Sequence, residues 1–319
     1  MRKALLLLSV AVALCLGDVG GAAVNRSAKL PTWSTGGPGG FAFAFGSAWI
    51  AGGDKLLRVD PKTNHVVARI RVPGCAWPVY GAGSMWLSQT GQIAEIDPAT
   101  NSITKRIAVN TSETDPLTYG FGSLWVVNRN GQLLRVSPAT GTTLAAIKVQ
   151  GPADWSPILA TGAGSVWVAS GDRHAVIRVD PATNSISATV TGISHTSSLL
   201  TVGVGQSAVW AHANAAASGR GILYRIDPGK AKIVAKIVTS HAMGGQYGGT
   251  NIAFGARSIW TINGNQLVSR IHAKPLRVVS SRTPPITAPN FIGFGYHSVW
   301  VQDFNSGQTV RIPVRRFRR

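Results

Sequence analysis

Acidic residues are scarce in this chain of 319 residues, which has 12 Asp and Glu against 31 Lys and Arg. Glutamate occurs only at positions 95 and 113, which excludes a coiled coil rich in Glu and Lys. A hydrophobic fraction of 45% excludes a disordered chain, and the 37 glycines lack the every-third-residue period of collagen. The formal net charge of +19 favours an anionic partner without naming its class.

Cysteine is nearly absent, with Cys15 and Cys75 as the two examples. Cys15 lies in a segment where two basic residues precede an apolar run over residues 4–16 and small residues follow at 20–23. This pattern predicts a secretory signal peptide over residues 1–23 and a secreted, periplasmic or cell-envelope protein. A lipidated Cys15 is the alternative, which the bulky Leu14 disfavours. Cys75 then stays alone, so packing rather than a disulfide must hold the fold. No other segment is apolar enough to span a membrane.

An internal repeat dominates the rest of the chain. A Trp follows a Gly-rich turn seven times, with spacings of 37, 39, 42, 43, 50 and 40 residues, at Trp49, Trp86, Trp125, Trp167, Trp210, Trp260 and Trp300. A second motif trails most of them, as in RVDPKTN at 58–64 and RVDPATN at 178–184. In the second unit we expect four short strands at 79–82, 85–88, 93–96 and 102–108.

Four-strand units of about 42 residues predict a β-propeller. The fold class is therefore all-β, a seven-bladed propeller of four-stranded blades over residues 24–314 with a basic tail at 315–319. The last unit has strands near 299–302 and 309–313 but no outer strand of its own. Residues 27–33 are expected to supply it, so that the N-terminal strand closes the last blade.

The text GAGSVWVAS…RVDPATNSISATV of residues 162–190 resembles the YVTN-type and streptogramin-lyase-like (virginiamycin B lyase-like) seven-bladed propellers. The resemblance covers nearly all of residues 34–314 and implies their fold. In those lyases a His and a Glu act with Mg²⁺ on a cyclic depsipeptide. Their blades commonly read W-F-T-E, whereas the same position here reads WIAG, WLSQ, WVVN, WVAS, WAHA, WTIN and WVQD, without Glu.

The repeated residues are interpreted as structural. A Trp present in every blade is expected to pack blade against blade, although a ring for stacking a ligand is the alternative. The third-strand arginines recur in the same way and are expected to lie on a neighbouring blade or pair with an acid of the Asp-Pro turn. A cationic stripe is the alternative, interrupted by Glu95. Cys75 is expected to be buried and unreactive.

Function should then reside where the blades differ, on the channel face. This face is formed by the loops that lead into each inner strand and by those that join strands two and three. Four consecutive leading loops carry ionisable residues, namely Glu113 with Asp115, Asp154, His195 and His241. The sharper hypothesis is that Asp154, His195 and His241 converge to bind a divalent metal, Mg²⁺ or Zn²⁺, or that His195 and His241 act as catalytic base and acid. The alternative is a rim of ordinary polar loop residues.

Further residues of this face are candidates for ligand binding. The aromatic ones stand in equivalent leading loops and would stack on a ring, unless they pack a loop onto its blade. The full set of predicted ligand-binding residues is Trp77, Asp115, Arg129, Asp154, Trp155, Asp172, Arg173, His212 and Asp303.

Three functions follow from these features. The leading one is an exported, non-catalytic protein that binds a small molecule, peptide or protein on its channel face. The second is a lyase-like enzyme that uses the channel-face histidines and a metal. The third is a basic protein that adheres to an anionic cell-envelope polymer, since residues 215–319 have 15 basic and 2 acidic residues. Nucleic acid is disfavoured for an exported protein, and a closed ring is expected to be a monomer.

Overall fold

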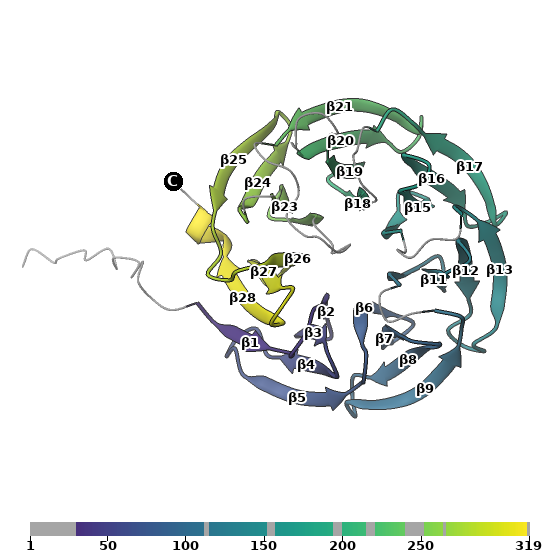
Figure 1. The fold of residues 1–319 in the computed structure, drawn as a ribbon. Helices are drawn as coiled ribbons and strands as arrows, with labels where there is room; N and C mark the ends of the chain where they lie inside the picture. The colour runs from purple at the N-terminus through teal and green to yellow at the C-terminus, as the bar shows by residue number, and fades with distance from the viewer. Residues whose placement is uncertain are drawn as a thin grey trace, which may run out of the picture.

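The computed structural model describes residues 30–111, 115–151, 157–193, 200–214, 221–239, 252–263 and 266–317. These residues form seven four-stranded antiparallel sheets, arranged as blades around a central axis (Figure 1). The prediction of an all-β seven-bladed propeller is therefore confirmed. No helix within the described ranges is long and apolar enough to cross a membrane. The predicted signal peptide, residues 1–23, lies outside these ranges.

In the first four blades the strands follow chain order from the axis outward. Blade one holds β2 (Gly39–Ala44), β3 (Ser47–Gly52), β4 (Lys55–Val59) and β5 (Val66–Arg71). Blade two holds β6 (Ala76–Gly81), β7 (Ser84–Gln89), β8 (Gln92–Asp97) and β9 (Ser102–Ala108). Blade three holds β10 (Leu117–Gly120), β11 (Ser123–Val127), β12 (Gln132–Val136) and β13 (Thr143–Lys148). Blade four holds β14 (Leu159–Gly162), β15 (Ser165–Ser170), β16 (Ala175–Asp180) and β17 (Ser185–Val190).

The remaining blades complete the ring. Blade five holds β18 (Leu200–Gly205), β19 (Ala208–Asn214), β20 (Gly221–Asp227) and β21 (Lys232–Val238). Blade six holds β22 (Ile252–Gly255), β23 (Ser258–Ile262), β24 (Val268–Ala273) and β25 (Leu276–Arg282). Blade seven holds β26 (Pro289–Gly295), β27 (Ser298–Asp303), β28 (Gln308–Pro313) and, as its outer strand, β1 (Thr32–Ser34).

The two ends of the chain both complete blades. β1 pairs antiparallel with β28, with Trp33 opposite Thr309, so the predicted closure by the N-terminal strand is confirmed. After β28 a 3-10 helix, η1 (Val314–Phe317), brings Phe317 against Trp260 of blade six, with ring centroids 4.8 Å apart. Phe317 is buried there, so part of the segment predicted as a basic tail packs between blades six and seven.

Alternating strand directions give each blade two distinct ends. The turns that join strands one to two and three to four lie at one end, here called the turn face. The loops that join strands two to three, and those that lead into the next inner strand, lie at the channel face. The innermost strands surround the axis (Figure 1), so both faces open onto it.

The seven repeated Trp side chains are buried, each at most 1% exposed. Each indole N–H donates to the carbonyl five residues earlier, at the end of the inner strand, over 2.9–3.1 Å. A buried indole with its N–H satisfied favours packing, so the structural interpretation of this repeat is confirmed. These rings are not open to a ligand.

The third-strand arginines link one blade to the next. Each lies over the Trp of its own blade, with the guanidinium carbon 5.0–6.0 Å from the ring centroid, as seen for Arg58, Arg135, Arg178, Arg225, Arg270 and Arg311. Arg58 also donates to the Pro98 carbonyl at 2.6 Å and to Asn101 Oδ1 at 2.9 Å in blade two. The neighbour thus offers a carbonyl and an amide oxygen rather than the turn acid that we expected.

The same link recurs from blade three to four through Arg135 and Asn184, and from blade seven to one through Arg311 and Asn64. Blade two departs from it because Glu95 replaces the arginine. There Lys105, opposite Glu95 on β9, donates to the Pro138 and Ala139 carbonyls of blade three. A lysine from the fourth strand therefore supplies the missing contact.

Blade five has an incomplete version of this arrangement. In five blades the arginine Nε donates to a Ser two residues before the Trp, over 2.8–2.9 Å. Ala208 occupies that position in blade five, and Arg225 Nε is buried without a hydrogen-bond partner. Replacing Ala208 by Ser should therefore raise the free energy of unfolding by about 1 kcal/mol. Urea unfolding measures this, with Ser258→Ala as the reciprocal control, which should lose about 1 kcal/mol. Loss of stability in both variants would contradict the assignment.

Candidate functional site

Trp77 and Phe291 cover the channel face between blades seven and two. Their ring centroids lie 5.4 Å apart in an edge-to-face arrangement, and the side chains are 9% and 5% exposed. Both inner strands shift register here, β6 between Ala76 and Val79 and β26 between Pro289 and Phe291. Gly40 of the intervening β2 has φ +92, and a Cβ there would lie 3.3 Å from the Phe291 ring. Trp77 thus packs across blade one, and its predicted stacking role stays a prediction.

Asp303 fastens the loops at this face of blade seven. Its Oδ2 accepts from the N–H and hydroxyl of Thr287 and from the Ala288 N–H at 2.7–3.0 Å. Its Oδ1 accepts from the Asn305 N–H and from the N–H and hydroxyl of Ser306 at 2.9–3.0 Å. Burial alone would raise the pKa of Asp303, but these hydrogen bonds outweigh it and lower the pKa to about 2. The carboxylate therefore stays ionised and orders the leading loop.

Asp172 has a similar role in blade four. Its Oδ1 accepts from the Ser170 hydroxyl at 2.7 Å, and its Oδ2 accepts from the Gly151 N–H at 2.8 Å. Burial opposes ionisation, but the hydrogen bonds prevail and the pKa is lowered. The side chain is exposed, so it joins two loops at the surface and is open to a ligand.

The position three residues after the repeated Trp supplies further tethers, which the sequence interpretation missed. Gln89 donates to the Pro73 carbonyl of its leading loop at 2.6 Å. Asn128 accepts from the N–H groups of Asn130 and Gln132 in the loop between strands two and three. Asp303 stands at the same position in blade seven. The signal in the sequence is the polar residue that ends the fragments WLSQ, WVVN and WVQD.

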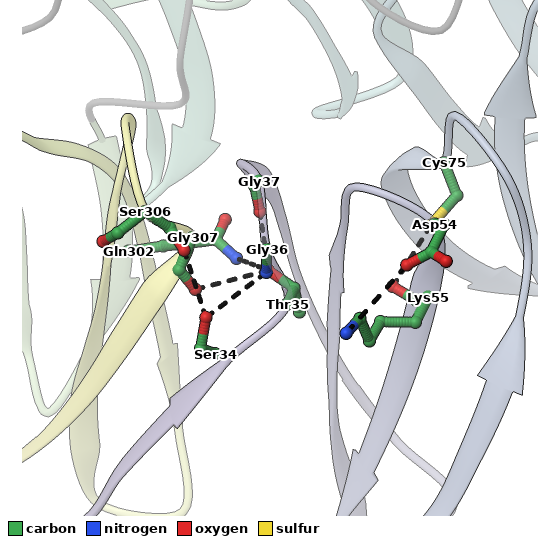
Figure 2. A network of polar contacts seen from close by, with 10 residues as sticks. All are labelled: Ser34, Thr35, Gly36, Gly37, Asp54, Lys55, Cys75, Gln302, Ser306 and Gly307. Atoms are coloured by element: carbon green, nitrogen blue, oxygen red, sulfur yellow. Dashed lines mark hydrogen bonds and ion pairs between the residues drawn. The ribbon is translucent and has the colours of Figure 1, made fainter.

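Gln302 joins blade seven to blade one below this face. It is fully buried, and its Oε1 accepts from the N–H groups of Gly39 and Gly40 at 2.9 and 3.0 Å. Its Nε2 donates to the Ala51 carbonyl at 2.9 Å and to Thr35 Oγ1 at 3.2 Å. Figure 2 shows this amide beside Thr35 and, as a separate group of contacts, the Cys75 thiol at the Lys55 carbonyl. Cys75 is 2% exposed, with Sγ 3.3 Å from the Lys55 carbonyl, as expected for an unreactive side chain.

His212 occupies the position of Gln302 in blade five, on β19 between Thr201 and Leu223 of the adjoining strands. It is fully buried, and neither ring nitrogen has a hydrogen-bond partner. Burial lowers its pKa to about 3, so the imidazole is neutral above that pH. This predicted ligand residue is thus enclosed within the blade.

The other predicted residues are spread around the face. Asp115 is buried, whereas Arg129 and Arg173 are exposed on the loops of blades three and four. Glu113, Asp154, Trp155, His195 and His241 lie outside the described residues, so their convergence stays a prediction. Within the described ranges no three His, Cys, Asp or Glu side chains gather as a metal site.

The net positive charge is largest over blades five to seven, because residues 215–319 have 15 basic and only 2 acidic residues. The exposed ones that the structure describes there are Lys230, Lys232, Lys236, Arg257, Lys274, Arg277 and Arg315. Asp227 and Asp303 are the acids of that part of the chain.

Comparison with known proteins supports the fold. The chain matches no protein-family model and no curated protein by sequence. Its structure is similar to virginiamycin B lyase from Staphylococcus aureus, with a TM-score of 0.70 and 14% identity, over 89% of this chain and 99% of that one. It is also similar to the hydrazine synthase of Kuenenia stuttgartiensis, with a TM-score of 0.67 and 12% identity, over 92% and 98%. At such identities the likeness shows a shared β-propeller fold and leaves the function open.

Proposed function

We propose that this protein is an exported propeller that binds a ligand or partner on its channel face without catalysing a reaction. The proposal rests on the residues three positions after the repeated Trp, which bind the backbone of nearby loops. Lyase-like blades commonly read Glu there, whereas Gln89, Asn128 and Asp303 tether loops in this chain. The polar side chains at this position hold the scaffold.

Ordered loops are what a binding face requires. The carboxylates of Asp172 and Asp303 fix two leading loops, and the Trp77–Phe291 pair fixes the face above blade one. Loops held before the ligand arrives lose little conformational entropy on binding. Exposed residues such as Arg129 and Arg173 then supply the specific contacts.

Selection from a displayed library of random cyclic peptides tests this proposal. Peptides that bind the purified protein should protect the loops leading into β14 and β26 from hydrogen exchange. Asp172→Asn, which weakens one tether, should reduce the affinity of those peptides several-fold. The exposed His65→Gln change on the opposite side of blade one serves as the control. Peptides that protect only outer strands would contradict a binding role for the channel face.

A lyase is the second candidate, favoured by the structural likeness over 99% of virginiamycin B lyase. It would use His195 and His241, with Asp154 as a third ligand for Mg²⁺ or Zn²⁺. These residues lie outside the described ranges. We expect no conversion of virginiamycin B by the purified protein with Mg²⁺ present, as followed by chromatography. Conversion that is lost in His195→Ala or His241→Ala would establish the enzyme instead.

A further inference from the structure

The links between the outer parts of neighbouring blades do not continue around the whole ring. Arginine links join blade one to two, blade three to four and blade seven to one, and Lys105 joins blade two to three. At the border of blades six and seven, η1 takes this part. Its Arg316 carbonyl accepts from Arg282 Nη1 at 3.1 Å, and Phe317 packs on Trp260. Among the described residues, five of the seven borders therefore have such a link.

The two borders of blade five differ from these. Arg178 of blade four donates through Nε to Ser165 of its own blade at 2.8 Å, and no hydrogen bond joins it to the described residues of blade five. Arg225 of blade five lies over Trp210 of its own blade and has no hydrogen bond to the part of blade six that the structure describes. Blade five is thus bordered on both sides by an arginine that does not reach its neighbour.

One residue explains the missing link between blades four and five. The turn between the outer two strands has an asparagine wherever it accepts from an arginine of the preceding blade. The φ angles of 62, 56 and 54° at these positions belong to Asn64, Asn101 and Asn184. Ala231 occupies the same position in blade five, with a φ of 48°. Alanine offers no amide oxygen to Arg178, and its Cβ makes the left-handed conformation unfavourable.

The border of blades five and six lacks its link for a different reason. The outer two strands of blade six, β24 and β25, are joined by the two residues Lys274 and Pro275, so the turn has no asparagine to accept from Arg225. Arg225 Nε and both ring nitrogens of His212 are also buried in blade five without a hydrogen-bond partner. Water can satisfy such groups once a blade opens, which lowers the free energy that opening requires.

We propose that blade five is the part of the ring that opens, separating from blades four and six while the other blades stay joined. A region with fewer fastening contacts opens at a lower free energy than the whole fold. The inner strand β18 borders the axis (Figure 1), so this movement changes the outline of the channel. The proposal concerns the borders between blades and does not depend on a ligand at the channel face.

Native-state hydrogen exchange of the wild-type protein tests the proposal, with mass spectrometry at a series of low urea concentrations. Relative to their intrinsic rates, peptides from β20 and β21 of blade five should exchange about tenfold faster than peptides from β12 and β13. Blade three is the matched comparison, because Lys105 links it to blade two and Arg135 links it to blade four. Equal protection of the two blades at every urea concentration would overturn the proposal.

Ala231→Asn should restore the link between blades four and five. The new amide oxygen would accept from Arg178 as Asn101 accepts from Arg58, and exchange in β20 and β21 should slow about tenfold. Exchange in β12 and β13 should not change. Asn184→Ala is the reciprocal variant, because it removes the partner of Arg135 and should speed exchange in β16 and β17.

Ala231→Gly is the control variant, because it relieves the same positive φ without offering an oxygen. In a protein that also has Arg178→Lys, Ala231→Asn should slow exchange no more than Ala231→Gly does. Thermal unfolding shows whether each variant is folded. The proposal is wrong if Ala231→Gly slows exchange in blade five as much as Ala231→Asn, or if the full effect of Ala231→Asn persists without Arg178.

Discussion

Replacing Gln302 by Ala is expected to lower the free energy of unfolding by about 4 kcal/mol. The substitution leaves the N–H groups of Gly39 and Gly40 and the Ala51 carbonyl without their partner in a fully buried site. Each unsatisfied buried group costs about 1–3 kcal/mol. Gln302 belongs to blade seven and these partners to blade one, so the loss falls on the closure of the ring. Urea unfolding monitored by Trp fluorescence measures the change.

Ser88 provides the matched control for Gln302. It occupies the same position in blade two, where its hydroxyl donates to the Ala76 carbonyl of the same blade at 3.2 Å. Ser88→Ala should cost about 1 kcal/mol. Hydrogen exchange should accelerate at Gly39 and Gly40 in Gln302→Ala and remain slow in Ser88→Ala. Equal costs in the two variants would show that the Gln302 amide has no special part in closing the ring.

Acid should destabilise this protein through His212, from about pH 6.5 downward. The unfolded chain binds a proton on this imidazole below its ordinary pKa of 6.5, whereas burial keeps the native pKa at about 3. The unfolded state therefore holds more protons in this window, and stability falls as the pH falls. The expected slope approaches 1.4 kcal/mol per pH unit between these values. Urea unfolding at a series of pH values measures it.

His212→Val should remove that slope, because Val127 fills the same position in blade three. The variant should be at least as stable as the wild type at pH 7, since it buries no unpaired ring nitrogen. The exposed His65→Gln serves as control and should retain the slope. Asp303 acts at lower pH. Its lowered pKa stabilises the folded state, and this contribution to the free energy of unfolding is lost only as the pH falls from about 3.8 to about 2. A slope that persists in His212→Val would contradict the assignment.

The repeated features of the fold were predictable because every blade needs the same contacts. The buried Trp recurs in all seven blades, and the Asp-Pro turn and the third-strand Arg recur in most of them, so a single chain contains its own comparison. The closure by residues 32–34 followed from counting strands in the last unit. Residues that occur in only one blade cannot be identified by comparing the blades with one another. Nothing in the sequence distinguishes Gln302 until its neighbours on the adjoining blade are known.

The candidate site was harder to predict because loops at the channel face come from distant parts of the chain. The sequence predicts Asp172 and Asp303 as ligand-binding residues, and the structure places their carboxylates on backbone N–H groups of the leading loops. Trp77 was selected as a stacking residue, and the register shift in β6 turns it toward Phe291. Such partners depend on backbone irregularities, which residue type alone does not indicate.

The arginine links have a consequence for how such a chain can be recombined. Arg58 of blade one requires Asn101 of blade two, and Arg135 of blade three requires Asn184 of blade four. Where Glu95 replaces the arginine, the next turn has Gly141 in place of the asparagine. Each of these links therefore joins the third strand of one blade to the turn between the third and fourth strands of the next blade. In a chimera of two propellers, any single cut between Arg58 and Asn101, whether inside blade one or at its border with blade two, would combine an arginine and an asparagine from different parents. A cut between Asn101 and Arg135 would keep each of these links within one parent.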